Sequence, residues 1–162
     1  MEVTLVDHMG SDLSIVNAAR VSFAKVHKEF KDGADTKLIR YLAKHNHWSP
    51  FGHASLQFHI RAPVFVARQL VKHQVGLTWN EVSRRYVDIE PEFFIPETWR
   101  ASAENKKQGS SAEEIDINPH NRVFDEYQTV LRSAKWTYEY LLRLGVCPEQ
   151  ARMVLPLSLI HI

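Results

Sequence analysis

The sequence predicts an α+β fold, in which a small mixed or antiparallel sheet packs with several helices. Segments that alternate apolar and polar residues, which is typical of strands, occur in the same chain as segments with helical spacing of apolar residues. These segments do not follow the βαβ rhythm of a doubly wound parallel sheet. With 162 residues, the chain is expected to form a single domain over residues 1–162.

Two strands are expected in the amino-terminal part of the chain. The run of residues 3–6 predicts a short first strand. Further along, Leu56, Phe58 and Ile60 alternate with polar residues, which predicts a strand with one buried face. The alternation indicates that the opposite face of this second strand lies in solvent.

Helices are expected between these strands. A helical turn over residues 14–19 precedes a polar loop over 25–33. Asp35 or Thr36 can then cap a helix that runs to about His45, because a side-chain oxygen at the cap accepts a hydrogen bond from the first turn.

The middle of the chain is expected to change from helix to extended backbone. Pro63 can open a helix, because its missing N–H would be unpaired there, and Gly76 can end that helix in a left-handed conformation. In the extended segment that follows, Glu81, Ser83 and Arg85 are expected to share one face at a spacing of two residues.

The carboxy-terminal part is expected to contain a loop and two helices. Residues 102–118 are poor in apolar residues, so we expect a mobile surface loop there. Residues 119–144 carry apolar side chains at helical spacing, which predicts a long amphipathic helix. Pro148 can open a further helix, which must stop near Pro156.

Composition narrows the classes of function. A net charge of +1 argues against bulk nucleic-acid binding, which favours a strongly basic domain. The single cysteine, Cys147, excludes an internal disulfide and is typical of a reducing cytoplasm, or of the host cytoplasm for a phage protein. No apolar run approaches the ~20 residues that span a bilayer. Acidic residues interrupt the first twelve positions, unlike a signal peptide.

The segment 68–86 is the most informative part of the chain. It is rich in Arg, Lys, amide and hydroxyl side chains and contains one carboxylate, Glu81. A solvated helix would instead alternate acidic and basic residues one turn apart. Such a concentration of donors suits a phosphate or another small anionic ligand.

Other chemistries fit these residues less well. His45, His47 and His53 do not have a strong zinc spacing, so no metal site is expected. Ser83 lacks both a nucleophile elbow and an activating Asp–His pair, so binding is a better interpretation than nucleophilic attack.

Three side chains keep two interpretations each. Arg152 can pair with Glu149 or another surface carboxylate, or it can bind a ligand. Trp48 and Trp79 can lie in the core or stack on a planar ring. The sequence does not decide between these alternatives.

The same segment resembles the signature of the flavin-dependent thymidylate synthases, Arg-His-Arg-x-x-Ser-x-Asn-Glu-x-Ser-x-Arg-Tyr, of the phage or bacterial type. Residues 80–86, Asn-Glu-Val-Ser-Arg-Arg-Tyr, match its second half. Lys72-His73-Gln74 stands at the Arg-His-Arg element, with two arginines replaced, and one extra residue lies between the halves. Residues 17–23, 44–53, 62–69 and 151–157 are also similar to blocks of that family.

The resemblance implies an activity and its cofactors. Members methylate dUMP to dTMP, with methylenetetrahydrofolate as carbon donor and reduced FAD as hydride donor, and NADPH reduces the flavin. It implies that Arg85 and Ser83 are catalytic residues, Arg85 by stabilising electron density pushed into the uracil ring. The implied dUMP ligands are Gln69, Glu81, Ser83, Arg85 and Arg152. The implied FAD ligands are Ser22, His47, Ser49, Lys72, His73, Gln74 and Val75.

The resemblance also implies a homotetramer whose sites combine residues from several subunits, with small-molecule substrates and neither a nucleic-acid nor a membrane partner. The family pattern continues beyond residues 151–157, and the last three residues, 160–162, do not fit it, so we expect a carboxy-terminally truncated member. Two alternatives stay open. One is a nucleic-acid-binding module that uses the basic segment 68–86, and the other is an inactive remnant of the synthase fold.

Overall fold

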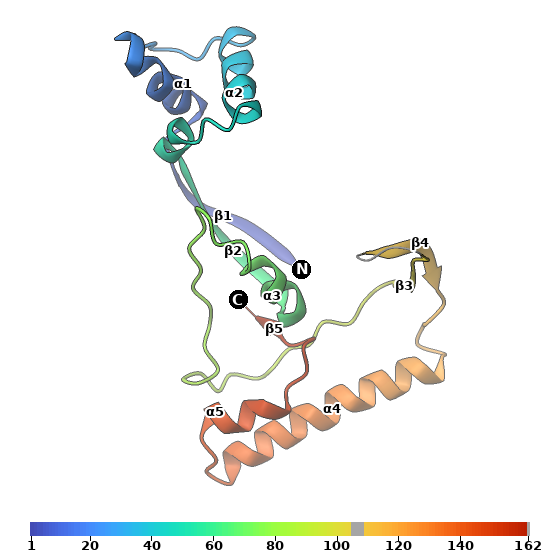
Figure 1. Ribbon diagram of the computed structural model, residues 1–162. Helices are drawn as coiled ribbons and strands as arrows, with labels where there is room; N and C mark the ends of the chain where they lie inside the picture. The colour runs from blue at the N-terminus through green and yellow to red at the C-terminus, as the bar shows by residue number, and fades with distance from the viewer. Residues whose placement is uncertain (105–108, 162) are drawn as a thin grey trace. The chain divides into compact units, whose positions relative to one another are not determined.

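The computed structural model describes residues 1–104 and 109–161 (Figure 1). Helices and two small antiparallel sheets make up the described chain, which confirms the predicted α+β class. None of the helices in these two ranges is long and apolar enough to cross a membrane.

The chain divides into two compact units. The amino-terminal unit comprises Glu2–Ile60, and the carboxy-terminal unit comprises Arg61–Ile162 together with Met1. A compact unit is defined by its internal contacts and need not fold alone. The expectation of a single domain over residues 1–162 therefore stays a prediction.

Two strands and two helices form most of the amino-terminal unit. They are β1 (Glu2–Met9), α1 (Asp12–Arg20), α2 (Ala34–Lys44) and most of β2 (Ser55–Pro63), with short 3₁₀ turns at Val21–Phe23 and Ser49–His53. The predicted first strand and helical turn are confirmed, and both are longer than expected. Ser11 and Ser14 begin α1 with reciprocal hydrogen bonds between side chain and backbone, which satisfy N–H groups of its first turn.

A buried carboxylate fastens the beginning of α2. The prediction that Asp35 or Thr36 caps this helix is wrong, because Gly33 is the cap and Asp35 lies in the first turn. Asp35 is fully buried, where it accepts hydrogen bonds from the Arg20 guanidinium and, at 2.8 Å, from the Lys31 N–H. The Arg20 bond is the main reason that the pKa of the Asp35 carboxyl lies below its ordinary value of 3.8.

The apolar face of β2 is not buried as predicted. The strand itself is confirmed, but Leu56 is 65% and Phe58 is 48% exposed. In β1, Val3 and Leu5 are also exposed. Alternation in a sequence shows that a strand has an apolar face, but it does not show that the same chain covers that face.

The carboxy-terminal unit contains the remaining elements. They are the end of β2, α3 (Val64–Leu70), β3 (Trp99–Ser102), β4 (Ser110–Ile115), α4 (Arg122–Arg143), α5 (Pro148–Ala151), a 3₁₀ turn at Arg152–Val154 and β5 (Ile160–His161). The end of β2 pairs antiparallel with β5, with Ala62 opposite His161 and Pro63 opposite Ile160. This pairing brings the first and last segments of the unit together (Figure 1).

The first N–H groups of α3 donate hydrogen bonds to main-chain carbonyls of the chain just before β5. Val64 N–H donates to the Leu159 carbonyl at 2.8 Å, and Phe65 N–H donates to the Leu157 carbonyl at 3.1 Å. These two donors would otherwise lack a partner within the helix.

The segment after α3 differs from the prediction in two respects. The helix ends at Leu70, and Gly76, with φ +72°, belongs to a later turn in which Leu77 N–H donates to the Gln74 carbonyl. Residues 84–86 also turn, and the N–H groups of Tyr86 and Val87 donate to the Ser83 carbonyl. The predicted extended row of Glu81, Ser83 and Arg85 is therefore wrong at Arg85.

A hairpin lies where a loop was predicted. Residues 110–115 form β4, which pairs antiparallel with β3, and the register of the pair shifts between Arg100 and Ser102. Most residues of β4 are exposed, so the strand needs no apolar alternation, and composition alone could not reveal it. Residues 105–108 of the predicted loop lie outside the described residues.

The long amphipathic helix is confirmed as α4. It begins at Arg122, three residues after Pro119, and Asn121 caps it by accepting a hydrogen bond from Val123 N–H at 2.9 Å. Leu131 and Tyr138 lie on its buried face. The short helix α5 packs against α4 (Figure 1).

Candidate functional site

A cavity of about 830 Å³ lies within the carboxy-terminal unit. Its walls come from α3, the segment after α3, α5 with its following turn, and the chain before β5. The lining residues are Val64, Ala67, Arg68, Val71, Glu81, Arg84, Cys147, Glu149, Gln150, Arg152, Met153, Leu155, Pro156, Leu157 and Leu159. A cavity of this size can hold a mononucleotide-sized ligand.

Charged side chains of both signs line this cavity, with cations in excess. The lining includes three arginines and two carboxylates, which are Arg68, Arg84, Arg152, Glu81 and Glu149. Guanidinium groups bind phosphates and carbonyl oxygens through pairs of N–H donors, whereas carboxylates accept from ring N–H and hydroxyl groups. The set can therefore bind an anion that also carries a polar ring.

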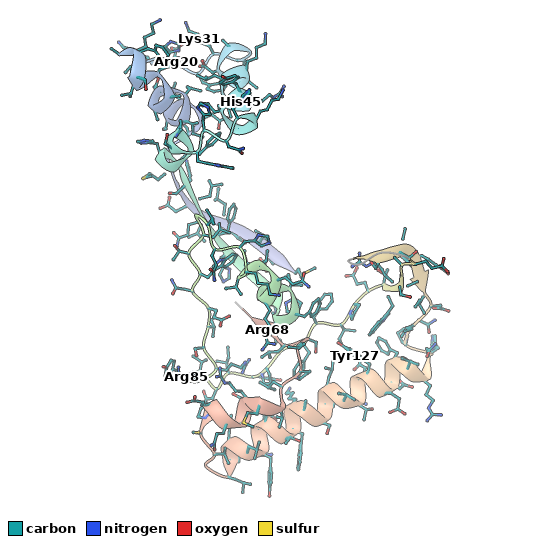
Figure 2. All side chains as sticks on the ribbon, viewed as in Figure 1. Arg20, Lys31, His45, Arg68, Arg85 and Tyr127 are labelled. Carbon is teal, nitrogen blue, oxygen red and sulfur yellow. The ribbon has the colours of Figure 1, made fainter. Side chains whose placement is uncertain are left out.

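Arg85 lies at the turn that follows this lining. Its Nε is 3.7 Å from a carboxylate oxygen of Glu149, and its guanidinium carbon is 5.2 Å from the centre of the Tyr86 ring. Figure 2 shows Arg85 beside α5, with Arg68 on α3 of the same unit. The Arg85 side chain is about half exposed, so its guanidinium is accessible to a ligand.

Arg84 has the opposite environment from its neighbour. Its residue exposure is 5%, and its guanidinium donates to the Ile89 carbonyl at 2.6 Å and to the Glu90 carbonyl at 3.4 Å. It also lies 5.7 Å from the centre of the Tyr138 ring on α4. Arg84 was not among the site residues predicted from the sequence.

The predicted nucleotide ligands are partly brought together. Glu81 and Arg152 line the cavity, and Arg85 contacts Glu149, which lines it as well. Gln69 and Ser83 are not among the lining residues; the Ser83 hydroxyl accepts the Arg85 N–H at 3.3 Å.

The two interpretations of Arg152 can be compared with its contacts. Its Nε donates to the backbone carbonyl of Glu149 at 3.3 Å, while the carboxylate of Glu149 lies near Arg85. Of the surface pairs that were open for Arg152, the structure does not form the one with the Glu149 carboxylate. A position in the cavity wall favours the ligand interpretation.

The predicted flavin ligands are divided between the two units. Lys72, His73, Gln74 and Val75 are exposed in the segment after α3, where the Trp79 indole donates to the His73 carbonyl at 3.3 Å. The other predicted flavin ligands, Ser22, His47 and Ser49, are exposed in the amino-terminal unit.

One aromatic ring lies near two histidines, one of which is the predicted flavin ligand His47. The Tyr41 ring lies 4.3 Å from the His45 ring and 6.1 Å from the His47 ring, measured between centres. Trp48 is 68% exposed, so its core interpretation is wrong, and Trp79 is 37% exposed. No group of three or more potential metal ligands occurs in the part of the chain that the structure describes.

The fold matches that of nucleotide methylases of known structure. The UMP/dUMP methylase PolB of Streptomyces cacaoi bound with 5-Br dUMP has a TM-score of 0.80 and is 36% identical, and the match covers 99% of this chain and 69% of that one. The same methylase bound with 5-Br UMP has a TM-score of 0.76 and 33% identity, covering 99% of this chain and 68% of that one.

Residues 4–161 match the sequence profile of the Thy1 family, described as thymidylate synthase complementing protein, and the chain belongs to this family. It is 42% identical over 157 residues to a flavin-dependent thymidylate synthase of Thermus thermophilus, a match that covers 97% of this chain and 56% of that protein. For the enzyme of the same name from Thermosipho africanus the identity is 40%, covering 95% of this chain and 66% of that protein. The chain thus spans about half to two thirds of the length of these relatives.

Proposed function

We propose that this chain is a flavin-dependent thymidylate synthase, which transfers a one-carbon unit from methylenetetrahydrofolate to C5 of dUMP and yields dTMP. The observation that carries the proposal is the cavity whose wall contains Glu81, Arg152 and Glu149, the last of which also contacts Arg85. Membership of the Thy1 family and the names of the relatives support the same reaction.

The side chains of the cavity suggest a division of roles. Arg152 is proposed to bind the phosphate, because a guanidinium can donate two N–H groups to it. Glu81 is proposed to accept a hydrogen bond from the nucleotide. Uracil C5 is a weak nucleophile, so Arg85 is proposed to stabilise the electron density that is pushed into the ring and onto its carbonyls, which makes C5 nucleophilic before it attacks. We also propose Gln69 and Ser83 as ligands, and Ser83 as a catalytic residue alongside Arg85.

The exposed predicted flavin ligands suit FAD by their donor chemistry. Lys72 supplies an ammonium group, His73 and Gln74 supply N–H donors, and Ser22 and Ser49 supply hydroxyls. The pyrophosphate and ring edges of FAD need donors of these kinds. Bound FAD would supply the hydride after its reduction by NADPH, and the protein residues named here would hold and orient it.

We further propose a homotetramer whose sites combine residues from several subunits. Exposed apolar side chains on both strands of the amino-terminal unit support an assembly, because Leu56, Phe58, Val3 and Leu5 would gain from burial against another subunit. A cytoplasmic location and the absence of nucleic-acid and membrane partners also stay proposals.

The proposal is tested by flavin binding and product formation in the purified chain. FAD fluorescence is followed with and without dUMP, and dTMP is measured after methylenetetrahydrofolate and NADPH are added. We expect flavin binding that responds to the nucleotide, followed by conversion. UMP is tested in parallel, because the solved relative is named for both nucleotides. Failure to bind either FAD or dUMP would contradict the proposal.

One variant tests the role of Arg85. Arg85→Ala should abolish turnover and leave the melting temperature nearly unchanged, because the side chain is half exposed and its ion pair is a surface pair. Arg132→Ala is the matched control, since Arg132 is exposed on α4, bonds Thr129 and does not line the cavity. Near-normal turnover of the Arg85 variant would refute its assigned role.

Ionic strength separates this proposal from the nucleic-acid alternative. A module that binds the phosphate backbone loses affinity steeply as salt rises and does not prefer a mononucleotide. We expect specific dUMP binding that unlabelled oligonucleotides do not displace.

A further inference from the structure

The environment of Arg84 is unusual for a cation. It is almost fully buried, yet none of the ion pairs among the described residues includes it. Its positive charge is instead matched by two main-chain carbonyls and the face of the Tyr138 ring. A buried charge is retained only where such partners offset its loss of water. These contacts therefore fix the position of the Arg84 side chain.

The same contacts fasten the segment 84–90 to α4. Arg84 connects the turn to the carbonyls of Ile89 and Glu90 and to Tyr138. The Glu90 side chain accepts a hydrogen bond from Lys135, which lies on α4 one turn before Tyr138. That contact lowers the pKa of the Glu90 carboxyl and raises that of the Lys135 ammonium. Two side-chain contacts therefore hold this segment on one face of the helix.

Arg85 is the next residue, and its side chain extends away from this anchor. It contacts Glu149 of α5 and the Tyr86 ring, whereas Arg84 is directed toward α4. The backbone of both residues belongs to one turn, closed by the Tyr86 N–H on the Ser83 carbonyl at 3.0 Å. A change at Arg84 would release the turn and so displace the Arg85 guanidinium.

We propose that Arg84 is a positioning residue for the nucleotide site: it anchors the turn 84–86 to α4 and thereby holds Arg85 toward the substrate. This inference rests on the proposed function for the identity of the ligand. Arg84 is assigned a positioning role rather than contact with the nucleotide, because it is only 5% exposed and two of its N–H donors bond the Ile89 and Glu90 carbonyls. Since fixed geometry is what makes an electrostatic group effective, loosening the turn weakens binding and turnover.

The experiment compares Arg84→Met, which keeps the length of the side chain without its donors, with Arg84→Lys, which keeps the charge. The affinity for dUMP is measured by calorimetry, alongside FAD affinity and melting temperature. We expect Arg84→Met to weaken dUMP binding by about tenfold, a typical size for coupled neighbours, with FAD affinity within about twofold of the parent. Arg84→Lys should recover part of that loss. A lowered melting temperature with unchanged dUMP affinity in both variants would overturn the proposal, since it would mean a purely structural role.

A double-mutant cycle with Arg85→Met separates positioning from direct contact. If Arg84 acts through Arg85, Arg84→Met has no further effect on dUMP affinity once Arg85 is replaced. Losses that simply add would mean that Arg84 contacts the ligand itself, which overturns the proposal.

Hydrogen exchange tests whether Arg84 anchors the turn 84–86 to α4, even if the parent chain binds no dUMP and the proposed function fails. Amide exchange over residues 83–90 should then still accelerate in Arg84→Met and recover in Arg84→Lys. Unchanged exchange in Arg84→Met would overturn the anchor itself. Because Arg84→Lys keeps the charge, it serves alone if Arg84→Met does not fold, and accelerated exchange over residues 83–90 with parental dUMP affinity in that variant would overturn the proposal.

Discussion

Two tyrosines on α4 should respond in opposite directions to the same substitution. Tyr138 is fully buried, and its hydroxyl has no hydrogen-bond partner among the described residues. Tyr127, labelled in Figure 2, is half-buried, and its hydroxyl donates to the Phe94 carbonyl at 3.0 Å. Removing one oxygen atom therefore relieves an unmet desolvation cost at Tyr138 but breaks a bond at Tyr127.

The expected magnitudes follow from these environments. A buried polar group without a partner costs about 1–3 kcal/mol, so Tyr138→Phe should raise the free energy of unfolding by about 1–2 kcal/mol while it keeps the ring under Arg84. For a chain of this size, that corresponds to a melting temperature higher by about 2–8 °C. Tyr127→Phe should lower the free energy of unfolding by about 1 kcal/mol, because it leaves the Phe94 carbonyl without its donor.

Thermal unfolding followed by circular dichroism measures both shifts at equal protein concentration, which is necessary if the protein assembles. The two variants differ from the parent by the same atom on the same helix, so each serves as the control for the other. A fall in melting temperature for Tyr138→Phe comparable with that for Tyr127→Phe would refute the reasoning, because it would mean that the Tyr138 hydroxyl is bonded in solution.

Two further predictions concern the packed parts of each unit. The lowered pKa of Asp35 means that its contribution to stability is present above its ordinary value of 3.8 and is lost as the pH falls through the lower folded-state pKa. Asp35→Asn should therefore flatten the stability profile below about pH 4, and an acid limb as steep as that of the parent would contradict this assignment. Leu131 is 6% exposed on α4, so Leu131→Ala should cost about 2–5 kcal/mol, whereas Val130→Ala at a 59% exposed neighbour should cost far less in the same urea titration.

An element could be predicted when its pattern lay in neighbouring residues, and it was missed or misplaced when it depended on contacts between residues far apart in the chain. Helix α4 could be predicted because its apolar residues keep helical spacing over 22 residues, and only its first turn was misplaced. Asp35 looks like a helix cap in the sequence, but a long-range bond from Arg20, fifteen residues earlier, places it inside α2. The exposed strand β4 has no apolar face, so its sequence lacks the apolar–polar alternation that would predict a strand.

The candidate site shows the same limit. Glu81, Arg85 and Arg152 were predicted from motifs. In the structure, Glu81 and Arg152 line the cavity, and Arg85 contacts Glu149 of α5, which lines it as well. Arg84 and Glu149 received no role in the site, because the contacts that distinguish them join residues that lie far apart in the chain. Which of two adjacent arginines is buried depends on the path of the turn, and that path is fixed by tertiary contacts rather than by local sequence.

The hydrogen bonds at the beginning of α3 have a consequence for how the cavity recognises charge. The carbonyls of Leu159 and Leu157 already occupy the N–H groups of Val64 and Phe65, so this helix end cannot bind a phosphate with those donors. If the cavity binds the proposed nucleotide, the donors for its phosphate are the guanidinium groups of the cavity wall, which stay protonated throughout the physiological range. The guanidinium donors contribute no titration in that range, and affinity for the proposed nucleotide should fall as the pH drops and the ligand phosphate gains its proton near pH ~6.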